Sequence, residues 1–147
     1  SDRGRKIASE MLVYGARFPV ILKNTWRNKS LPAMNIWGKA MNNLQINKKY
    51  NIAFSIINYT DIEESGATEE ELEGLPGFLS NLHGVKALLW MREEKNKIIK
   101  GSLRTKDDNI DISTLAKLLG GGGHAKASGF SIKGKLQKNK LNWKIVN

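Results

Sequence analysis

The sequence predicts an α/β protein, in which a small mixed β-sheet domain is flanked by helices and preceded by an N-terminal helical segment. Apolar residues recur every three or four positions in the first third of the chain, which is the period of a helix. From Tyr50 they alternate with smaller or polar residues, which is the period of a strand. Because 40% of the 147 residues are hydrophobic, one compact domain can bury a core. We therefore expect a helical segment at 1–46 and a sheet domain at 47–147.

Two helices are expected in the first segment. Residues 5–14 carry apolar side chains at helical spacing and stop at Gly15. Ser30 can cap a second helix, and Pro32 suits its first turn because the amide there needs no partner. An apolar stripe on this second helix either packs in the core or joins two copies of the chain; it consists of Met34, Trp37, Met41 and Leu44.

The sheet domain begins with an alternating strand at 52–56. Thr68 and Glu71 then form a capping-box pattern that opens a helix. The segment 74–77 contains two glycines and a proline, so it should break this helix before it resumes over 78–82.

Two further strands are predicted at 85–92 and 97–105, joined across 93–96 as a hairpin-like pair. Asp111 can cap the next helix, which the glycine run from Gly120 ends.

A last core strand is predicted at 127–132. The tail from 133 to 147 is basic and has alternating apolar residues near its end. It forms either an edge strand of the sheet or a small appendage.

The charge of the chain favours an anionic partner. Lys and Arg number 24 against 14 Asp and Glu, a formal charge of +10, so nucleic acid or nucleotide is the leading partner class and a basic solvated surface is the alternative. There is no cysteine, which excludes disulfides and thiolate metal sites. No apolar run reaches the roughly 20 residues of a membrane span, and no signal-peptide pattern opens the chain. We expect a cytoplasmic protein with no membrane contact, and the start at Ser1 indicates a segment of a longer chain.

Alternation along the strand at 97–105 places Lys100, Ser102 and Arg104 on one face. The guanidinium of Arg104 offers a rigid fork of donors that suits phosphate, and the hydroxyl of Ser102 can add one contact. The alternative for Arg104 is a surface ion pair with Asp107 or Asp108.

The glycine run follows a helix instead of preceding one, so Walker-type and dinucleotide-binding loops are poor matches. Gly121, Gly122 and Gly123 nevertheless allow a ligand to approach the backbone closely, and their amides can form an anion-binding nest. The alternative is a flexible helix stop.

His124 follows the glycines and can donate to a phosphate or a ribose. The other histidine, His83, lies at a turn, and neither belongs to a spaced cluster of His, Asp and Glu, so we assign no metal site and no catalytic residue. Trp26 and Trp90 could stack on bases, but core packing is the favoured role.

Three runs in fixed order carry a family resemblance: SLRT at 102–105, GGGGH at 120–124 and ASGF at 127–130. Together they resemble the DHH-associated domain of DHH-family phosphoesterases, closest to the branch of nano-RNases and cyclic-dinucleotide phosphodiesterases. The stretch ELEGLPGFLSNLHGVKALLWMRE at 71–93 is similar to the helix and strand that precede this motif. The runs RGRKIASEMLVYGARF at 3–18 and MNIWGKAMNNL at 34–44 resemble the end of the catalytic domain and the linker that follows it.

The resemblance implies a hydrolase of two domains. A DHH domain would bind two divalent metal ions, manganese in the family, and hydrolyse a phosphodiester, while the associated domain grips the substrate. By position, Arg104 and His124 would hold the ligand, and Ser102 with Gly121 to Gly123 would line the cleft. The implied substrates are short RNA or DNA, cyclic dinucleotides or nucleotide phosphates.

The sequence contains no Asp-His-His string. We therefore expect this segment to bind substrate, to need no cofactor of its own and to be inactive without the DHH domain of its parent chain. Homodimer formation is a further expectation. Two alternatives are a non-catalytic RNA-binding or oligomerisation module, as in alanyl-tRNA synthetases, and a basic structural domain.

Overall fold

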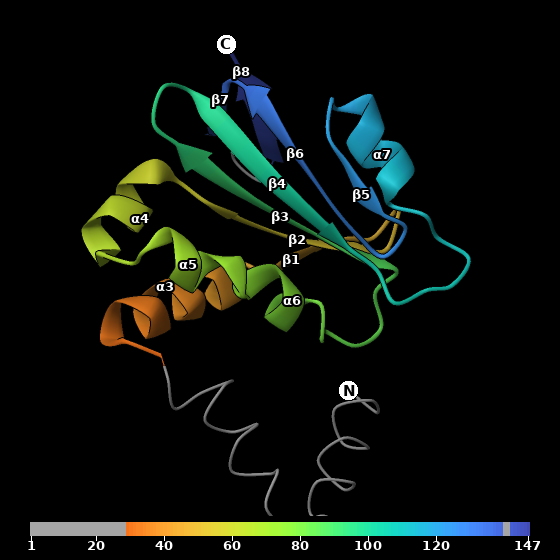
Figure 1. The fold of residues 1–147 in the computed structure, drawn as a ribbon, viewed down its shortest axis with the longest axis horizontal. Coiled ribbons are helices and arrows are strands. Elements are labelled where there is room, and N and C mark those ends of the chain that lie inside the picture. Colours follow the sequence, from red (N-terminus) through yellow and green to blue (C-terminus); the bar gives the residue numbers. More distant parts are fainter. Residues whose placement is uncertain (1–28, 140–141) are drawn as a thin grey trace, which may run out of the picture.

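The computed structural model describes residues 29–139 and 142–147, so the helix expected at 5–14 and Trp26 lie outside it. A six-stranded sheet dominates this part of the chain, and a separate two-stranded sheet follows it (Figure 1). In chain order the elements are α3 (Leu31–Asn42), β1 (Gln45–Asn47), β2 (Ile52–Ile57), α4 (Tyr59–Ser65), α5 (Glu69–Glu73), α6 (Leu75–Leu79), β3 (Ala87–Glu94), β4 (Ile98–Arg104), α7 (Ser113–Leu118), β5 (Gly122–His124), β6 (Ala127–Lys133), β7 (Lys135–Asn139) and β8 (Asn142–Val146).

The large sheet is mixed, which confirms the predicted fold class. Its strand order is β1-β2-β3-β4-β6-β5, and β2 with β3 is its one parallel pair in the described residues. A parallel pair needs a crossover, and α4, α5 and α6 supply it between β2 and β3. The hairpin of β3 and β4 has the predicted antiparallel pairing, with its turn at 95–97.

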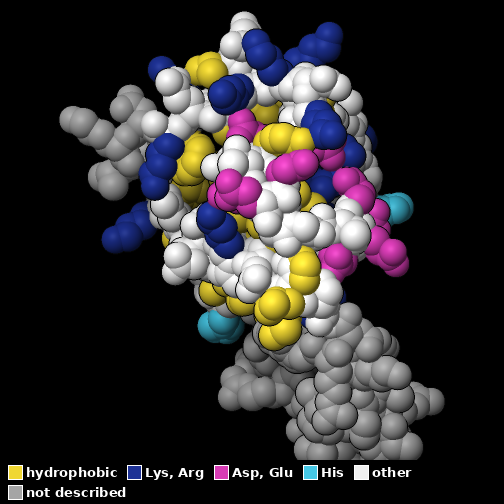
Figure 2. Space-filling view, turned by 90° about the vertical axis from the view of Figure 1, so that its left-hand side faces the viewer, with side chains coloured by type: hydrophobic (Ala, Val, Ile, Leu, Met, Phe, Trp, Pro, Cys, Tyr) yellow, Lys and Arg dark blue, Asp and Glu magenta, His cyan; other side chains and the backbone are white. Residues whose placement is uncertain are grey.

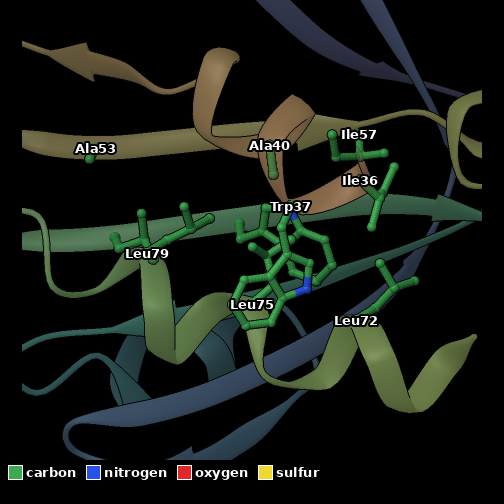
Figure 3. Close-up of a cluster of buried hydrophobic side chains, with 10 residues drawn as sticks. Ile36, Trp37, Ala40, Ala53, Ile57, Leu72, Leu75 and Leu79 are labelled. Carbon is green, nitrogen blue, oxygen red and sulfur yellow. The ribbon is translucent and has the colours of Figure 1, made fainter. Parts of the chain in front are cut away.

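Helices α3, α5 and α6 lie on one face of the sheet and bury a core against β2 and β3 (Figure 3). Leu72 and Leu75 from the crossover helices meet Trp37 of α3 in this core. The indole Nε1 of Trp37 donates to the backbone oxygen of Glu71 at 2.8 Å, which ties α3 to α5. Helix α3 is therefore packed on the sheet although it precedes the boundary predicted at residue 46, and that boundary stays a prediction.

The apolar stripe predicted on α3 is only partly buried. Trp37 is buried at 5% exposure, whereas Met34 and Met41 are exposed at 50% and 37%. The helix instead turns a different set of residues toward the core, because positions three and four apart follow the 3.6-residue period; they are Ala33, Ile36, Trp37 and Ala40.

Helix α7 covers the opposite face of the sheet, beside β5 and β6 (Figure 1). Ile112 and Ala116 pack there against Leu103 of β4 and Phe130 of β6. Because α3, α5 and α6 cover β2 and β3 on the first face, the β4–β6–β5 half of that face has less helical cover.

The predicted helix starts are confirmed in two places. The Ser30 hydroxyl accepts from the backbone N of Ala33 at 3.1 Å and caps α3. Thr68 and Glu71 form the predicted capping box of α5. Asp111 was expected to be the N-cap of the helix at this position, but the N-cap of α7 is Ile112. Asp111 precedes the N-cap by one residue and accepts from the backbone N of Ser113 at 2.9 Å.

Three short elements differ from the sequence prediction. Helix α4 and strand β1 were not predicted, and both are short elements with no buried residue. Pro76 and Gly77 were expected to break the chain between helices but lie inside α6, where Pro76 is in the first turn and needs no amide partner.

The basic tail forms an appendage, since β7 and β8 pair only with each other in the described residues. Leu136 of β7 is buried against Ile56 and Ile99 and anchors this hairpin to the large sheet. Within the described ranges, no helix has the length and apolar character needed to cross a membrane.

Candidate substrate-binding groove

A groove of about 400 Å³ runs between the crossover helices and the less covered half of the sheet. Leu72 and Pro76 form its helical side. Residues of β3, β4 and β6 form its sheet side, among them Trp90, Arg92, Lys100, Ser102, Arg104 and Gly129. The structure thus places two of the predicted site residues, Ser102 and Arg104, in one groove.

Strand register brings His124 to the same face of the sheet as Arg104. Arg104 pairs with Ala127 of β6, and Ala127 pairs with His124 of β5. Residues directly opposite each other in a ladder project from the same face, so Arg104 and His124 share the face on which the groove opens. His124 is exposed and lies at the end of this row, two strands from Arg104, outside the lining of the groove itself.

A second row, parallel to the first, has no side chain at two of its three positions. Ser102 pairs with Gly129, and Gly129 pairs with Gly122. Gly122 has nothing within 4 Å of the position where a Cβ would lie, so its backbone borders open space. The bare backbone of Gly122 and Gly129 therefore leaves room for a ligand beside Ser102 and between the two ends of the Arg104 row.

Arg104 has no carboxylate partner among the described residues. Its Nη1 donates to the backbone oxygens of Leu103 at 2.9 Å and Ser128 at 3.4 Å. The acid that was an alternative partner, Asp108, pairs instead with Lys126. Burial lowers the pKa of Arg104 below its usual value, but a guanidinium with that shift stays charged in the neutral range. The remaining donors of this cation are free to hold an anion.

The opposite end of the groove is electrically neutralised. Arg92 and Lys100 share the carboxylates of Glu69 and Glu94, with Arg92–Glu94 at 3.3 Å, Lys100–Glu94 at 3.1 Å and Lys100–Glu69 at 3.5 Å. Two positive and two negative groups therefore cancel there. Among the described residues that line the groove, Arg104 is the cation without an ion pair, and Glu73 is an acid without one.

The glycine run is more ordered than a loop. Gly122, Gly123 and His124 form β5, and Gly123 adopts φ +139°, which favours glycine. The amide of Gly121 donates to Ala116 O at 2.8 Å, so it is not available to a ligand. A Cβ on Gly121 would lie 2.0 Å from the backbone oxygen of Gly129, which shows that this glycine serves close packing.

Trp90 and Gly129 belong to the groove but were not assigned to the site from sequence. Trp90 is buried at 3% exposure, which agrees with its favoured role in the core, although its Nε1 has no hydrogen-bond partner among the described residues. The guanidinium of Arg92 lies 5.8 Å from the centre of its ring. Gly129 could have been suspected, because a glycine inside a strand often marks a close approach of a ligand or another backbone.

No group of three or more His, Asp and Glu side chains in the described part of the chain is close enough to hold a metal ion. The two histidines are both exposed, His83 at a turn and His124 on β5. The described residues thus bring a guanidinium and a hydroxyl together in one groove, with an imidazole further along the same face of the sheet.

Comparisons with known sequences find relatives of this chain. The model of the DHHA1 domain matches residues 47–146. A bifunctional oligoribonuclease and PAP phosphatase, NrnA of Bacillus subtilis, is 27% identical over 132 residues, and the chain spans 41% of the length of that relative.

A solved structure shares the fold. An exopolyphosphatase-related protein from Bacteroides fragilis superposes with a TM-score of 0.70 at 24% identity, over 92% of this chain and 39% of that one. A pGpG-specific phosphodiesterase, PggH from Vibrio cholerae, superposes with a TM-score of 0.45 at 14% identity, over 69% of this chain and 33% of that one.

Proposed function

The chain belongs to the DHHA1 domain family, and on that premise we propose that it is the substrate-binding part of a DHH phosphoesterase that acts on short oligonucleotides or dinucleotides. The relative of known activity, NrnA, is named as an oligoribonuclease and phosphatase, so both of its substrate types present phosphate groups. In such an enzyme, the role of this domain is to bind phosphate.

One observation carries the proposal: the half-buried Arg104 guanidinium has no carboxylate partner in the described residues and faces a groove floored by bare backbone. A desolvated cation without a counter-charge is costly unless an anion is supplied. Phosphate suits the fork of donors on a guanidinium.

We assign roles to the other residues on the same face. The imidazole of His124 donates to a phosphate or ribose at the far end of the row, and the Ser102 hydroxyl donates to an oxygen over Gly129. Gly122 admits the ligand, whereas Gly121 and Gly123 set the position of β5. In this proposal the hydrolysis itself belongs to two divalent metal ions of a DHH domain, and no step of it is assigned to the residues described here.

Fluorescence anisotropy with a labelled RNA dinucleotide tests the proposal. Arg104→Gln removes the charge at nearly constant volume and should weaken binding about 10-fold or more, because hydrogen bonds to charged groups contribute about 1.5–3 kcal/mol. Lys48→Gln is the matched control: it also removes one positive charge, from an exposed turn at the β1 edge of the sheet. Equal affinity of the Arg104 variant and the native protein would overturn the proposed function.

A further inference from the structure

A second cluster of positive charge lies at the other end of β4 and β6. Lys95 and Lys97 belong to the β3–β4 turn, and Lys133 and Lys135 flank the connection from β6 to β7. The backbone brings the two segments together, since the amide of Gly134 donates to Lys97 O at 2.8 Å. Figure 2 shows the side of the molecule that carries this turn, where Lys and Arg side chains gather over the upper part.

A cavity of about 440 Å³ opens between these segments and the start of α4. Three lysines line it, Lys95, Lys97 and Lys135, and none of them has a carboxylate partner among the described residues. We call this hollow the lysine cavity.

The two acids in the lysine cavity are already engaged. Glu93 is buried and accepts from the backbone N of Tyr59 at 3.3 Å and of Leu136 at 3.0 Å. Glu94 belongs to the ion pairs with Arg92 and Lys100. The amides that bond Glu93 carry no charge, so one carboxylate offsets part of the charge of the three lysines, and the cavity keeps an excess of positive groups for an anion from outside.

The lysine cavity and the substrate-binding groove have a neighbouring hollow in common. A third hollow of about 290 Å³ shares Leu72 and Arg92 with the groove, and it shares Tyr59, Glu93, Glu94 and Lys95 with the lysine cavity. Strand geometry of about 3.3 Å per residue puts Lys97 and Arg104 roughly 23 Å apart along β4. Two nucleotides joined by one phosphodiester cannot reach both ends of this path, whereas a chain of several nucleotides can.

We propose that the lysine cavity is a second phosphate-binding site, which holds the backbone of a single-stranded oligonucleotide whose end lies at Arg104. This inference rests on the proposed function and adds a preference for length to it. Positively charged grooves that track a single-stranded backbone use contacts of this kind, which are insensitive to base sequence and sensitive to salt.

Anisotropy titrations of a labelled RNA dinucleotide and a labelled RNA octanucleotide test the site. The variant is Lys97→Asn with Lys135→Gln; asparagine suits the φ of +56° at position 97, and both positions are exposed. The octanucleotide should bind roughly 10- to 25-fold more weakly at 0.1 M monovalent salt, and the slope of log K against log salt should fall by about 1.4, since each lost contact to a single strand accounts for about 0.7. Dinucleotide affinity should stay within about twofold.

The matched control is Lys48→Asn with Lys49→Gln, which removes the same charge from the exposed β1–β2 turn and should leave the octanucleotide affinity within about twofold. Equal weakening by the two pairs, or equal weakening of both probes, would overturn the inference, and so would an unchanged octanucleotide affinity. Failure of the proposed function has a different signature, an unchanged dinucleotide affinity in Arg104→Gln. If the double variant melts early, Lys135→Gln alone should lower the salt slope by about 0.7.

Discussion

Arg104 of β4 and His124 of β5 both pair with Ala127 of β6, so their side chains project from the same face of the sheet at the two ends of one three-strand row. With strands about 4.8 Å apart, the two backbones are separated by roughly 10 Å. A small central residue, Ala127, separates them, and the adjacent row contains Gly122 and Gly129. The guanidinium and the imidazole are therefore two strand spacings apart on a row whose middle residue has a small side chain.

Replacing His124 by alanine should weaken dinucleotide binding about 5- to 10-fold without lowering the stability of the fold, because a typical hydrogen bond contributes about 0.5–1.5 kcal/mol net. His124 is exposed, so truncation leaves no cavity. Anisotropy titration with a thermal melt measures both quantities. His83→Ala is the control, since His83 is also exposed but lies at a turn away from the groove lining. A similar loss in both variants would argue against a direct contact from His124.

Substitutions at Gly121 and Gly122 should have different effects, one on the stability of the fold and the other on ligand binding. Gly121→Ala forces a Cβ to within 2.0 Å of the Gly129 backbone oxygen, and we expect it to lower the free energy of unfolding by about 2–4 kcal/mol, as overpacking against rigid backbone does. Gly122→Ala meets nothing within 4 Å and should change stability by less than about 1 kcal/mol.

The same Gly122→Ala variant should weaken ligand binding, because its methyl group would stand beside Gly129 on the face that the ligand occupies. Urea denaturation and anisotropy on the two variants check the pair of outcomes. A Gly122→Ala protein with native stability and native affinity would show that the ligand does not pass over this row.

Much of the fold is readable from local patterns. The Ser30 cap, the Thr68–Glu71 box and the β3–β4 hairpin are each set by residues close in sequence, and each is present. The features that depend on contacts between residues far apart in the sequence could not be predicted from local patterns. The face that α3 turns to the core depends on Leu72 and Leu75 some 40 positions away, so the stripe based on Met34 was misplaced.

The site shows the same division. Alternation along β4 correctly placed Ser102 and Arg104 on one face, because it follows from strand geometry alone. The row through Ala127 to His124 depends on the register of three strands, which no local pattern fixes. From the sequence, only the resemblance to the DHH-associated domain assigned these residues to one site. Their function in ligand binding stays a proposal.

Trp37→Ala should lower the free energy of unfolding by about 3–5 kcal/mol, the usual cost of truncating a buried aromatic side chain. Trp37 is 5% exposed, packs against Phe78 with ring centres 5.2 Å apart and donates to Glu71 O. Met34→Ala on the same helix is the control and should cost less than about 1 kcal/mol, since Met34 is half exposed. Guanidinium denaturation followed by fluorescence of the remaining tryptophans measures both. A small effect of Trp37→Ala would mean that α3 is not part of the cooperative unit.

Acid should destabilise the fold through Glu71, whose carboxylate accepts from the Ser30 hydroxyl and from the Thr68 backbone N at 3.1 Å. The hydrogen bond from Ser30, followed by that from Thr68, lowers the pKa of Glu71 below its ordinary value of 4.5. Because the folded pKa is the lower one, the unfolded chain takes up its proton first as pH falls. The stabilisation is complete above about pH 4.5 and is lost as pH drops through the folded pKa.

Glu71→Gln should therefore reduce stability at pH 7 and flatten the fall in melting temperature between about pH 5 and pH 3, since the amide cannot titrate. Glu70→Gln is the control, because the neighbouring Glu70 makes no side-chain hydrogen bond or ion pair within the described residues. Melting curves at half-unit pH intervals distinguish the two variants. A Glu71→Gln profile that runs parallel to the native one through this window would assign the acid sensitivity to other carboxylates, of which Glu69, bonded to Arg92, also has a lowered pKa.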